Sequence, residues 1–284
     1  MSSDLSVIIN GKLLPAENAH ILISDLSIQR GYGVFDFFKT INGVPVFLED
    51  HLDRLYRSAD QMHLDFGYDR DALKAMLFEL MDMNDMPLSG VKITVTGGYA
   101  EDGYTLAKPN VIITQQPLLL YNDVNASPLK IVSYKHQRQM PHIKTIDYLM
   151  AIWLQPFIKQ NQADDVLYHN NGVITECPRS NFFIVTNDDV LVTPVNNVLY
   201  GITRTQIFRH FKHICTMQER SINLDEVYRA KEAFVTNSSK NILPVIKVDQ
   251  HLIGTGKPGL LTLQIKKELL QLIAAESPAS VALS

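Results

Sequence analysis

Residues 141–181 read PHIKTIDYLMAIWLQPFIKQNQADDVLYHNNGVITECPRSN, and this stretch decides how the rest of the chain is interpreted. Lys144 stands at the start of a predicted helix, and short strands are predicted at residues 165–168 and 173–175. The second of these strands ends on Glu176. One compact segment therefore carries a lysine at a helix start and a carboxylate at a strand end. The apolar positions of the predicted helix include Leu149, Ile152, Trp153, Pro156 and Phe157.

Spacing alone does not make Lys144 and Glu176 a site. Lysines at helix starts are mostly solvated, and a glutamate at the end of a strand can simply lie at a sheet edge. A short motif is only a hypothesis until other blocks of the sequence support it. On spacing alone the ordinary alternative is therefore favoured.

Composition places the chain among ordinary globular proteins. It has 284 residues, enough for a large core and two domains, with 46% hydrophobic and 20% charged residues. A net charge of −4 and the lack of a basic run argue against a nucleic-acid surface. Only Cys177 and Cys215 are present, too few for a disulfide framework, so a reducing cytoplasm is expected. The N-terminus does not resemble a signal peptide, and no apolar run reaches the roughly 18 residues of a membrane span.

The first part of the chain, residues 1–117, is predicted to be a small domain of strands and two helices. The Asn10-Gly11 and Asn42-Gly43 pairs indicate hairpin turns. Asp69 or Asp71 can cap the second helix. Strands are predicted at residues 5–9, 34–41, 44–47, 91–97 and 110–115, and helices at 49–63 and 72–83.

A linker is predicted at residues 118–128, followed by a larger domain at 129–284. Thr203 or Thr205 can cap a helix at 203–213. The other helices are predicted at 224–230 and 258–275, and the strands at 129–133, 165–168, 173–175, 181–185, 190–193, 232–236 and 246–248.

Several sequence blocks occur in the order found in one enzyme family. The chain resembles the class IV aminotransferases, the fold-type IV pyridoxal phosphate enzymes, from about residue 6 to 270. The resemblance implies a mixed α/β fold with a small α+β domain and a larger pseudo-barrel domain. It also implies pyridoxal 5′-phosphate as cofactor, amino acid and 2-oxo acid substrates, and a homodimer. The blocks are GYGVFD, HLDRLYRSA, KTIDYL, GVITE followed by SNFF, LYGITR and FVTNSSKNILPV.

The resemblance gives Lys144 and Glu176 roles at the cofactor ring. Lys144 is expected to form the Schiff base and then to move the Cα proton of the substrate. Lys92, in the strand VKITV, is the one competing lysine. Glu176 is expected to face the pyridine nitrogen and keep it protonated. Tyr148 matches a tyrosine beside the cofactor ring, although Asp147 precedes it where many members have asparagine.

The cofactor phosphate needs several donors. The resemblance assigns Arg54 to it, since guanidinium binds phosphate in a bidentate, directional way; the alternative is a charge on the helix surface. Ile202 and Thr203 lie where free amides and a helix dipole attract an anion, and Thr203 can be a helix cap as well. Ser238, with Asn237 beside it, matches the remaining hydroxyl donor.

The substrate pocket departs from the better-known patterns. The tyrosine and arginine positions at which relatives hold carboxylates are occupied here by Phe35, Lys92 and Gly97, so Phe35 and Lys92 are assigned to the substrate site. Arg30 and Arg179 stand in unusual places and are predicted to bind substrate carboxylates, which suits D-amino acids and 2-oxoglutarate. The alternative is that each arginine pairs with a surface acid.

Three other functions stay open at this stage. A branched-chain L-amino acid aminotransferase would use an apolar pocket near Tyr32 and Phe35. An aminodeoxychorismate lyase would use the same cofactor and lysine to eliminate pyruvate. A non-enzymatic scaffold of this fold would not need the lysine, the acid and the phosphate donors together. No metal site is expected, because the nine histidines show no ligand spacing backed by acids; His51 is assigned to polar surface or packing.

Overall fold

The computed structural model describes residues 5–118 and 127–278, which divide into two compact units. The first unit consists of the described parts of Met1–Leu120, Ile143–Asp147 and Ala274–Ser284. The second consists of the described parts of Tyr121–His142 and Tyr148–Ile273. The linker predicted at residues 118–128 lies almost wholly outside the described residues. The predicted domain boundaries stay a prediction, and the segment around Lys144 groups with the first unit.

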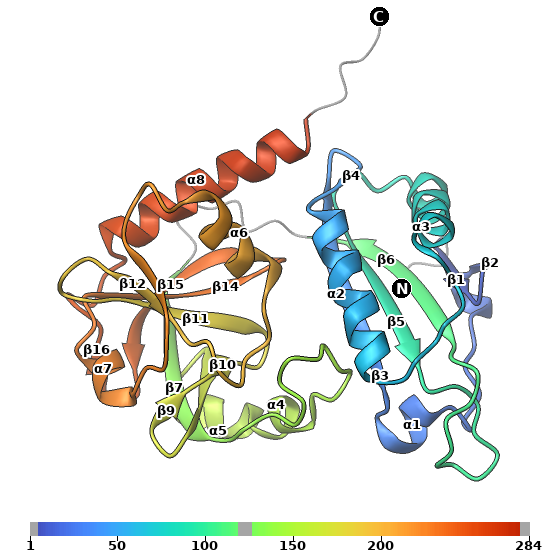
Figure 1. Ribbon diagram of the computed structural model, residues 1–284, viewed down its shortest axis with the longest axis horizontal. Coiled ribbons are helices and arrows are strands. Elements are labelled where there is room, and N and C mark those ends of the chain that lie inside the picture. Colours follow the sequence, from blue (N-terminus) through green and yellow to red (C-terminus); the bar gives the residue numbers. More distant parts are fainter. Residues whose placement is uncertain (1–4, 119–126, 279–284) are drawn as a thin grey trace, which may run out of the picture. The chain divides into compact units, whose positions relative to one another are not determined.

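The first unit contains a six-stranded sheet in the order β2-β1-β6-β5-β3-β4, and all its strand pairs are antiparallel (Figure 1). The two predicted Asn-Gly turns join β1 to β2 and β3 to β4. Both residues of each turn have positive φ, as a type I′ turn requires. The strands are β1 (Ser6–Ile9), β2 (Lys12–Pro15), β3 (Gly33–Ile41), β4 (Val44–Pro45), β5 (Ser89–Thr96) and β6 (Val111–Pro117).

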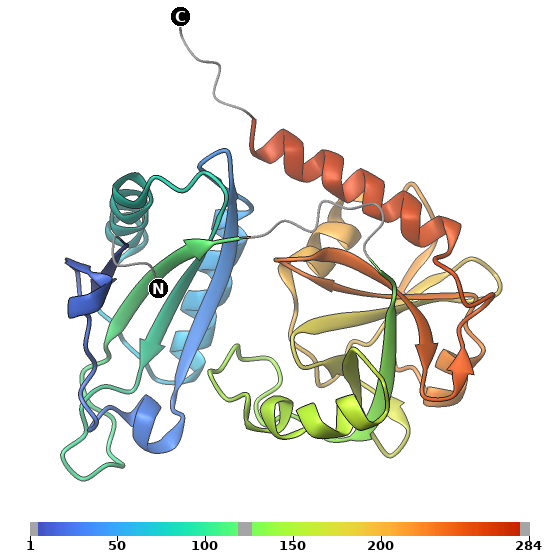
Figure 2. The same cartoon turned by 180° about the vertical axis from the view of Figure 1, so that it is seen from behind.

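Two long helices, α2 (Leu48–Gln61) and α3 (Arg70–Asn84), cover one face of this sheet (Figures 1 and 2). Both were predicted, and Asp69 caps α3 by accepting a hydrogen bond from the amide of Ala72. The structure adds a one-turn 3₁₀ helix, Ala16–Asn18, and the short helix α1 (Leu26–Arg30). The apolar side chains of α2, α3 and the covered sheet face form one core, which makes the sheet a rigid support for polar groups placed on it.

The helix predicted to begin at Lys144 does not begin there. Residues 143–147 run alongside the start of β3: Phe35 N donates to Lys144 O at 3.0 Å, and Ile146 N donates to Gly33 O at 3.0 Å. Thr145 forms an isolated bridge with Val34. The backbone groups of this segment are thus satisfied by a strand edge instead of by a helical turn.

The following helical region is two short helices instead of one. They are α4 (Leu149–Trp153) and α5 (Gln155–Gln160), and Pro156 lies in the first turn of α5. Proline is tolerated there because the first amides of a helix have no partner within it. The apolar side chains of Leu149, Ile152 and Trp153 are exposed instead of buried.

The second unit is built on a curled ten-stranded mixed sheet (Figure 2). Its main path runs β13-β12-β11-β14-β15-β7-β8-β9, and β10 and β16 pair with β11 and β15. The mixed α/β fold class predicted above is therefore confirmed. The strands are β7 (Leu129–Lys135), β8 (Asp165–Asn170), β9 (Val173–Ile174), β10 (Glu176–Cys177), β11 (Ser180–Val185), β12 (Leu191–Thr193), β13 (Met217–Glu219), β14 (Glu232–Asn237), β15 (Asn241–Val248) and β16 (His251–Leu252).

Three further helices pack in or begin from this unit: α6 (Ile202–His210), α7 (Leu224–Tyr228) and α8 (Leu260–Glu276). The buried Glu232 accepts hydrogen bonds from Leu261 N at 3.1 Å and Thr262 N at 2.8 Å, so β14 supplies the anion at the N-terminal end of α8. Within residues 5–118 and 127–278, none of the helices combines the length and apolarity needed to cross a membrane.

Candidate active site

In the first unit, helix α2 turns a row of buried polar side chains toward strand β3. His51, Arg54 and Ser58 lie one helical turn apart and are all buried. Asp36 of β3 is fully buried opposite them. Its carboxylate accepts two hydrogen bonds from Arg54, Nε at 2.7 Å and Nη2 at 2.8 Å, and contacts His51 Nδ1 at 2.7 Å. The arginine predicted for the phosphate is therefore no surface charge, because an ion pair holds it inside the unit.

Charge within this row settles two protonation states. Burial raises the pKa of Asp36, but Arg54 and then His51 outweigh it, so the net pKa is well below the ordinary value. Burial lowers the pKa of His51, and the charges of Arg54 and Lys144 add to this against the opposing effect of Asp36. At neutral pH, Asp36 is ionised and His51 is neutral.

Lys144 lies beside the same helix and the same strand. Its amide donates to Ser58 Oγ at 3.4 Å, and its Nζ is 4.5 Å from the centre of the Phe35 ring. Lys92 Nζ, from β5, is 4.9 Å from that ring centre. Desolvation lowers the pKa of Lys92. The structure thus brings Lys144, Lys92 and Phe35 together, and Arg54 is on the helix that holds the Lys144 backbone.

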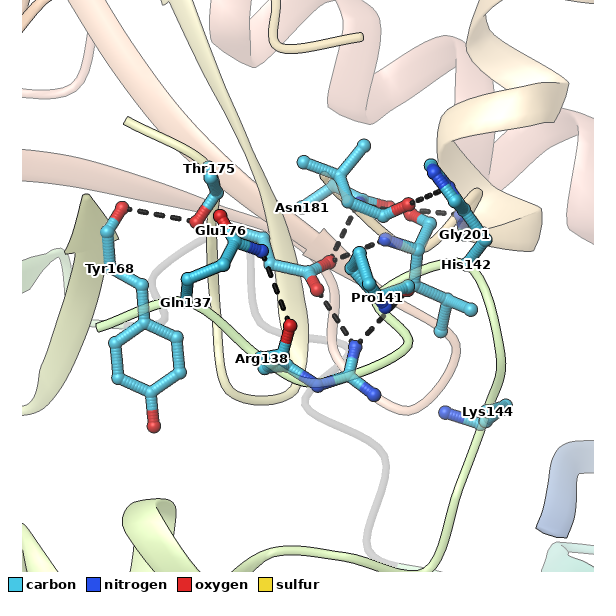
Figure 3. A network of polar contacts seen from close by, with 12 residues as sticks. Gln137, Arg138, Pro141, His142, Lys144, Tyr168, Thr175, Glu176, Asn181 and Gly201 are labelled. Carbon is cyan, nitrogen blue, oxygen red and sulfur yellow. Dashed lines mark hydrogen bonds and ion pairs between the residues drawn. The ribbon is translucent and has the colours of Figure 1, made fainter. Parts of the chain in front are cut away.

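In the second unit, Glu176 is buried and well bonded (Figure 3). Its Oε1 accepts from Arg138 Nη1 at 2.8 Å. Its Oε2 accepts from Leu199 N at 3.0 Å and from Asn181 Nδ2 at 3.4 Å. Glu176 begins β10, whose register places it opposite Asn181 of β11. The carboxylate is therefore fixed by three separate segments of the chain.

The N-terminal turn of α6 forms a small anion cradle. Its N-cap is Gly201, with no side-chain cap, so the predicted capping by Thr203 or Thr205 is wrong. Gly201 N donates to Asn181 Oδ1 at 3.1 Å, and a Cβ at this position would overlap that oxygen. Within the described residues, the amides of Ile202 and Thr203 and the Thr203 hydroxyl have no hydrogen-bond partner. These are the groups that a helix N-terminus offers to a phosphate.

The turn between β14 and β15 lies beside β11. Asn237 Nδ2 donates to Ser180 Oγ at 2.9 Å, and Asn237 Oδ1 accepts from Lys240 N at 2.7 Å. Asn237 thus shapes the turn, which corresponds to a structural role. The hydroxyl of Ser238 makes no hydrogen bond in the part of the chain that is described, so it remains a donor for a ligand.

The two unusual arginines are exposed. Arg30 ends α1, and its Nη1 donates to the carbonyl of Gln29 at 2.9 Å. Arg179 lies in the turn between β10 and β11 and forms no ion pair with a described residue. Burial raises the pKa of Asp165, and the Val166 amide and then the Arg179 charge partly offset this. Across residues 5–118 and 127–278, neither arginine is bound to a surface acid.

The remaining prediction, Tyr148, immediately precedes α4, and its carbonyl accepts from Ile152 N. Three residues of the site were not found from the sequence: Asp36, Arg138 and Asn181. Asp36 closes the GYGVFD block, and Asn181 stands in SNFF, so both lay inside quoted motifs. Arg138 lies in no motif, and its pairing with Glu176 spans 38 residues. His51, assigned to surface or packing, is buried against Asp36.

Comparison with known proteins identifies the family. The profile described as "Amino-transferase class IV" matches residues 33–248. The chain is 26% identical over 287 residues to a D-alanine aminotransferase of Bacillus licheniformis, covering 98% of this chain and 100% of that one. It is 26% identical over 275 residues to a putative branched-chain-amino-acid aminotransferase of Methanocaldococcus jannaschii, covering 93% and 95%.

Solved structures agree with the fold. The branched-chain amino acid aminotransferase of T.th., solved with pyridoxamine 5′-phosphate, superimposes with a TM-score of 0.89 at 20% identity, covering 97% of this chain and 96% of that one. The chain belongs to the class IV aminotransferases, which are pyridoxal-phosphate-dependent enzymes. The D-alanine and branched-chain relatives named above are both 26% identical to it, so family membership does not decide the substrate.

The residues present fit pyridoxal phosphate. A phosphate needs donors; Arg54 is one in the first unit, and the amides that begin α6 and the Ser238 hydroxyl are others in the second. A pyridine nitrogen needs a fixed acid, and Glu176 is one. An aldehyde needs an amine, and Lys144 lies against Phe35 instead of in an acidic cluster.

Proposed function

We propose that this aminotransferase moves an amino group from a D-amino acid to a 2-oxo acid such as 2-oxoglutarate. The observation that carries the proposal is the state of Arg30 and Arg179. Both are exposed, and neither has an acidic partner among the described residues, so both guanidinium groups are available to substrate carboxylates. The matched D-alanine aminotransferases are consistent with this assignment.

Lys144 is the proposed Schiff-base and proton-transfer residue. Pyridoxal phosphate, when bound, supplies the electron sink that makes the substrate Cα proton acidic. Lys144 takes that proton and returns it during transamination, which requires a neutral amine. The backbone bonds to Phe35 and Ser58 hold the lysine at a fixed position, and Lys92 adds a positive charge at the same ring, which disfavours protonation of Lys144.

The other cofactor residues are proposed to bind and orient. Arg54, Ile202, Thr203 and Ser238 hold the phosphate, and Asn237 shapes the turn that presents Ser238. Glu176 holds the proton at the pyridine nitrogen. Tyr148 is proposed to lie beside the ring.

The substrate side is proposed to use four residues. Arg30 and Arg179 bind carboxylates, while Phe35 and Lys92 form the wall next to Lys144. Lys92 can also attract a carboxylate, since its ammonium group lies against the ring that Lys144 contacts.

Single-turnover spectroscopy tests the substrate assignment. The holoenzyme is mixed with D-Glu, D-Ala, L-Leu and L-Val, and the change in cofactor absorbance is timed. We expect fast reaction with the D-amino acids and at least a tenfold loss for D-Glu in Arg179→Ala. Arg229→Ala, which removes an exposed arginine of the same unit, is the control. Unchanged D-Glu rates in Arg179→Ala remove Arg179 from the site, and faster reaction with L-Leu overturns the D-amino acid assignment.

The branched-chain alternative is supported by the M. jannaschii relative and the solved structures, and the L-Leu and L-Val arms test it. Pyruvate release from aminodeoxychorismate would instead indicate the lyase reaction. The homodimer that the family resemblance implies is also a proposal, and sedimentation velocity of the purified chain tests it.

A further inference from the structure

Glu176 is a buried carboxylate of the second unit with a partly buried arginine against it. Only 4% of the residue is exposed. Arg138 approaches Oε1 at 2.8 Å, and the Arg138 side chain is itself only 15% exposed. Figure 3 shows this guanidinium group lying between Glu176 and the carbonyl of Pro141, which it contacts at 3.4 Å. The arginine of this ion pair therefore has a second anchor on the backbone.

The charge of Arg138 has a large effect at such a place. A carboxylate removed from water is driven toward its neutral form unless an opposite charge or donors compensate. The bonds from Leu199 N and Asn181 are between a carboxylate and neutral donors. Arg138 is a cation in direct contact with the carboxylate, and hydrogen bonds between two charged partners are the strong ones.

Other titratable groups around Glu176 do not replace that charge. Tyr168 and Cys177 are neutral, since burial raises the pKa of each, and Asp165 beside them is an acid. Arg204, in α6, is bonded to Glu219 and to the Pro194 carbonyl. Glu176 raises the pKa of Arg204 less than Glu219 does, so the Arg204 charge is directed mainly elsewhere.

We propose that Arg138 is a positioning residue that keeps Glu176 ionised and aimed at the pyridine nitrogen of pyridoxal phosphate. The inference rests on the proposed role of Glu176. Arg138 acts at two levels. It fixes one carboxylate oxygen, and its positive charge limits how strongly the ring and the groups conjugated with it hold protons.

The test measures cofactor binding and the charge state of the bound cofactor instead of turnover. Three variants are compared with the wild type: Arg138→Met, Arg138→Lys and, as a control, Arg220→Met. Arg220 pairs with Glu226 in the same unit, and both are about one-third exposed. For each holoenzyme, equilibrium dialysis gives the dissociation constant of pyridoxal phosphate. A pH titration of the visible absorbance gives the protonation midpoint, and urea unfolding reports on stability.

We expect Arg138→Met to weaken cofactor binding at least tenfold. We also expect it to move the absorbance midpoint upward, because a charge that opposes proton uptake is lost. Arg138→Lys, which keeps the charge, should stay within about threefold of the wild type in affinity. Arg220→Met should change neither quantity. A loss of urea stability alone, with the midpoint unmoved, would show a purely structural residue and overturn the proposal. Equal losses in Arg138→Met and Arg138→Lys would also overturn it.

A double variant separates this inference from the role of Glu176. If Arg138 acts through Glu176, the loss caused by Arg138→Met should shrink to less than threefold in a Glu176→Gln background. Full additivity overturns the inference. If Glu176→Gln alone leaves both affinity and midpoint unchanged, the proposed role of Glu176 fails instead, and the two failures are thereby distinguished.

Discussion

Replacing Asp36 with asparagine should destabilise the first unit more than any surface substitution. Asp36 is fully buried and accepts two hydrogen bonds from Arg54 and one contact from His51. Asparagine has nearly the same shape, so packing is unchanged. It lacks the charge, however, and presents one amide nitrogen to groups that are themselves donors. Arg54 is then left buried without its counter-charge.

The size of the effect follows from these contacts. Breaking a buried ion pair by removing one partner costs roughly 3–5 kcal/mol, and asparagine retains one acceptor, so we expect about 3 kcal/mol. Domains have roughly 5–15 kcal/mol of stability in total. With a urea dependence of about 2 kcal/mol per molar, the unfolding midpoint should fall by about 1.5 M.

The assay is urea unfolding of Asp36→Asn followed by circular dichroism. Glu49→Gln is the matched control, because Glu49 also pairs with cations, Arg70 and Lys74, but is 60% exposed. Exposed ion pairs contribute about 0–1 kcal/mol, so the control should hardly move. If Asp36→Asn shifts the midpoint no further than Glu49→Gln, the ion pair is not what holds Arg54, and the argument is refuted.

Two more predictions use the same geometry. Gly201→Ala should weaken pyridoxal phosphate binding about tenfold in equilibrium dialysis, because the new Cβ displaces Asn181 from the start of α6; unchanged affinity would contradict the cradle at α6. His51 has a folded pKa below its ordinary value, so the unfolded chain takes up a proton more readily and stability should fall as pH drops below about 6.5. In His51→Asn, whose amide can still donate to Asp36, the loss of unfolding free energy between pH 7.5 and 5.5 should be smaller, and equal losses would exclude His51 as the cause.

Local patterns predicted most helices and strands because their signals are local. The Asn-Gly pairs impose positive φ, and the apolar periodicity of α2 and α3 matches the face that they bury. Lys144 was misplaced at a helix start for the opposite reason. Its partners, Phe35 and Ser58, are about a hundred residues earlier, and a pattern read within one window cannot contain them.

The partners of the predicted site residues were also beyond reach. Asp36 with Arg54 spans 18 residues, Gly201 with Asn181 spans 20, and Arg138 with Glu176 spans 38. A buried charge must find a counter-charge, so each of the two ion pairs was required. Which residue supplies it depends on the register of the sheet, and composition does not reveal that register.

One amide ties two of the proposed cofactor contacts together. Asn181 donates to Glu176 through Nδ2 and accepts from Gly201 through Oδ1. Within the second unit, the acid proposed for the ring nitrogen and the helix proposed for the phosphate therefore cannot shift independently. A substitution at either end disturbs the other through Asn181.

The proposed substrate residues are held in a different way. Arg30 and Arg179 lie at a helix end and in a turn, are exposed, and take part in no buried network among the described residues. Changing either costs little folding free energy, since substitutions at exposed sites usually stay within about 0.5 kcal/mol. Changing Glu176, Asn181 or Asp36 breaks buried bonds that the fold depends on. This difference explains how one fold can keep its cofactor chemistry while the carboxylate-binding residues vary, and why the motifs of this sequence identify the cofactor more firmly than the substrate.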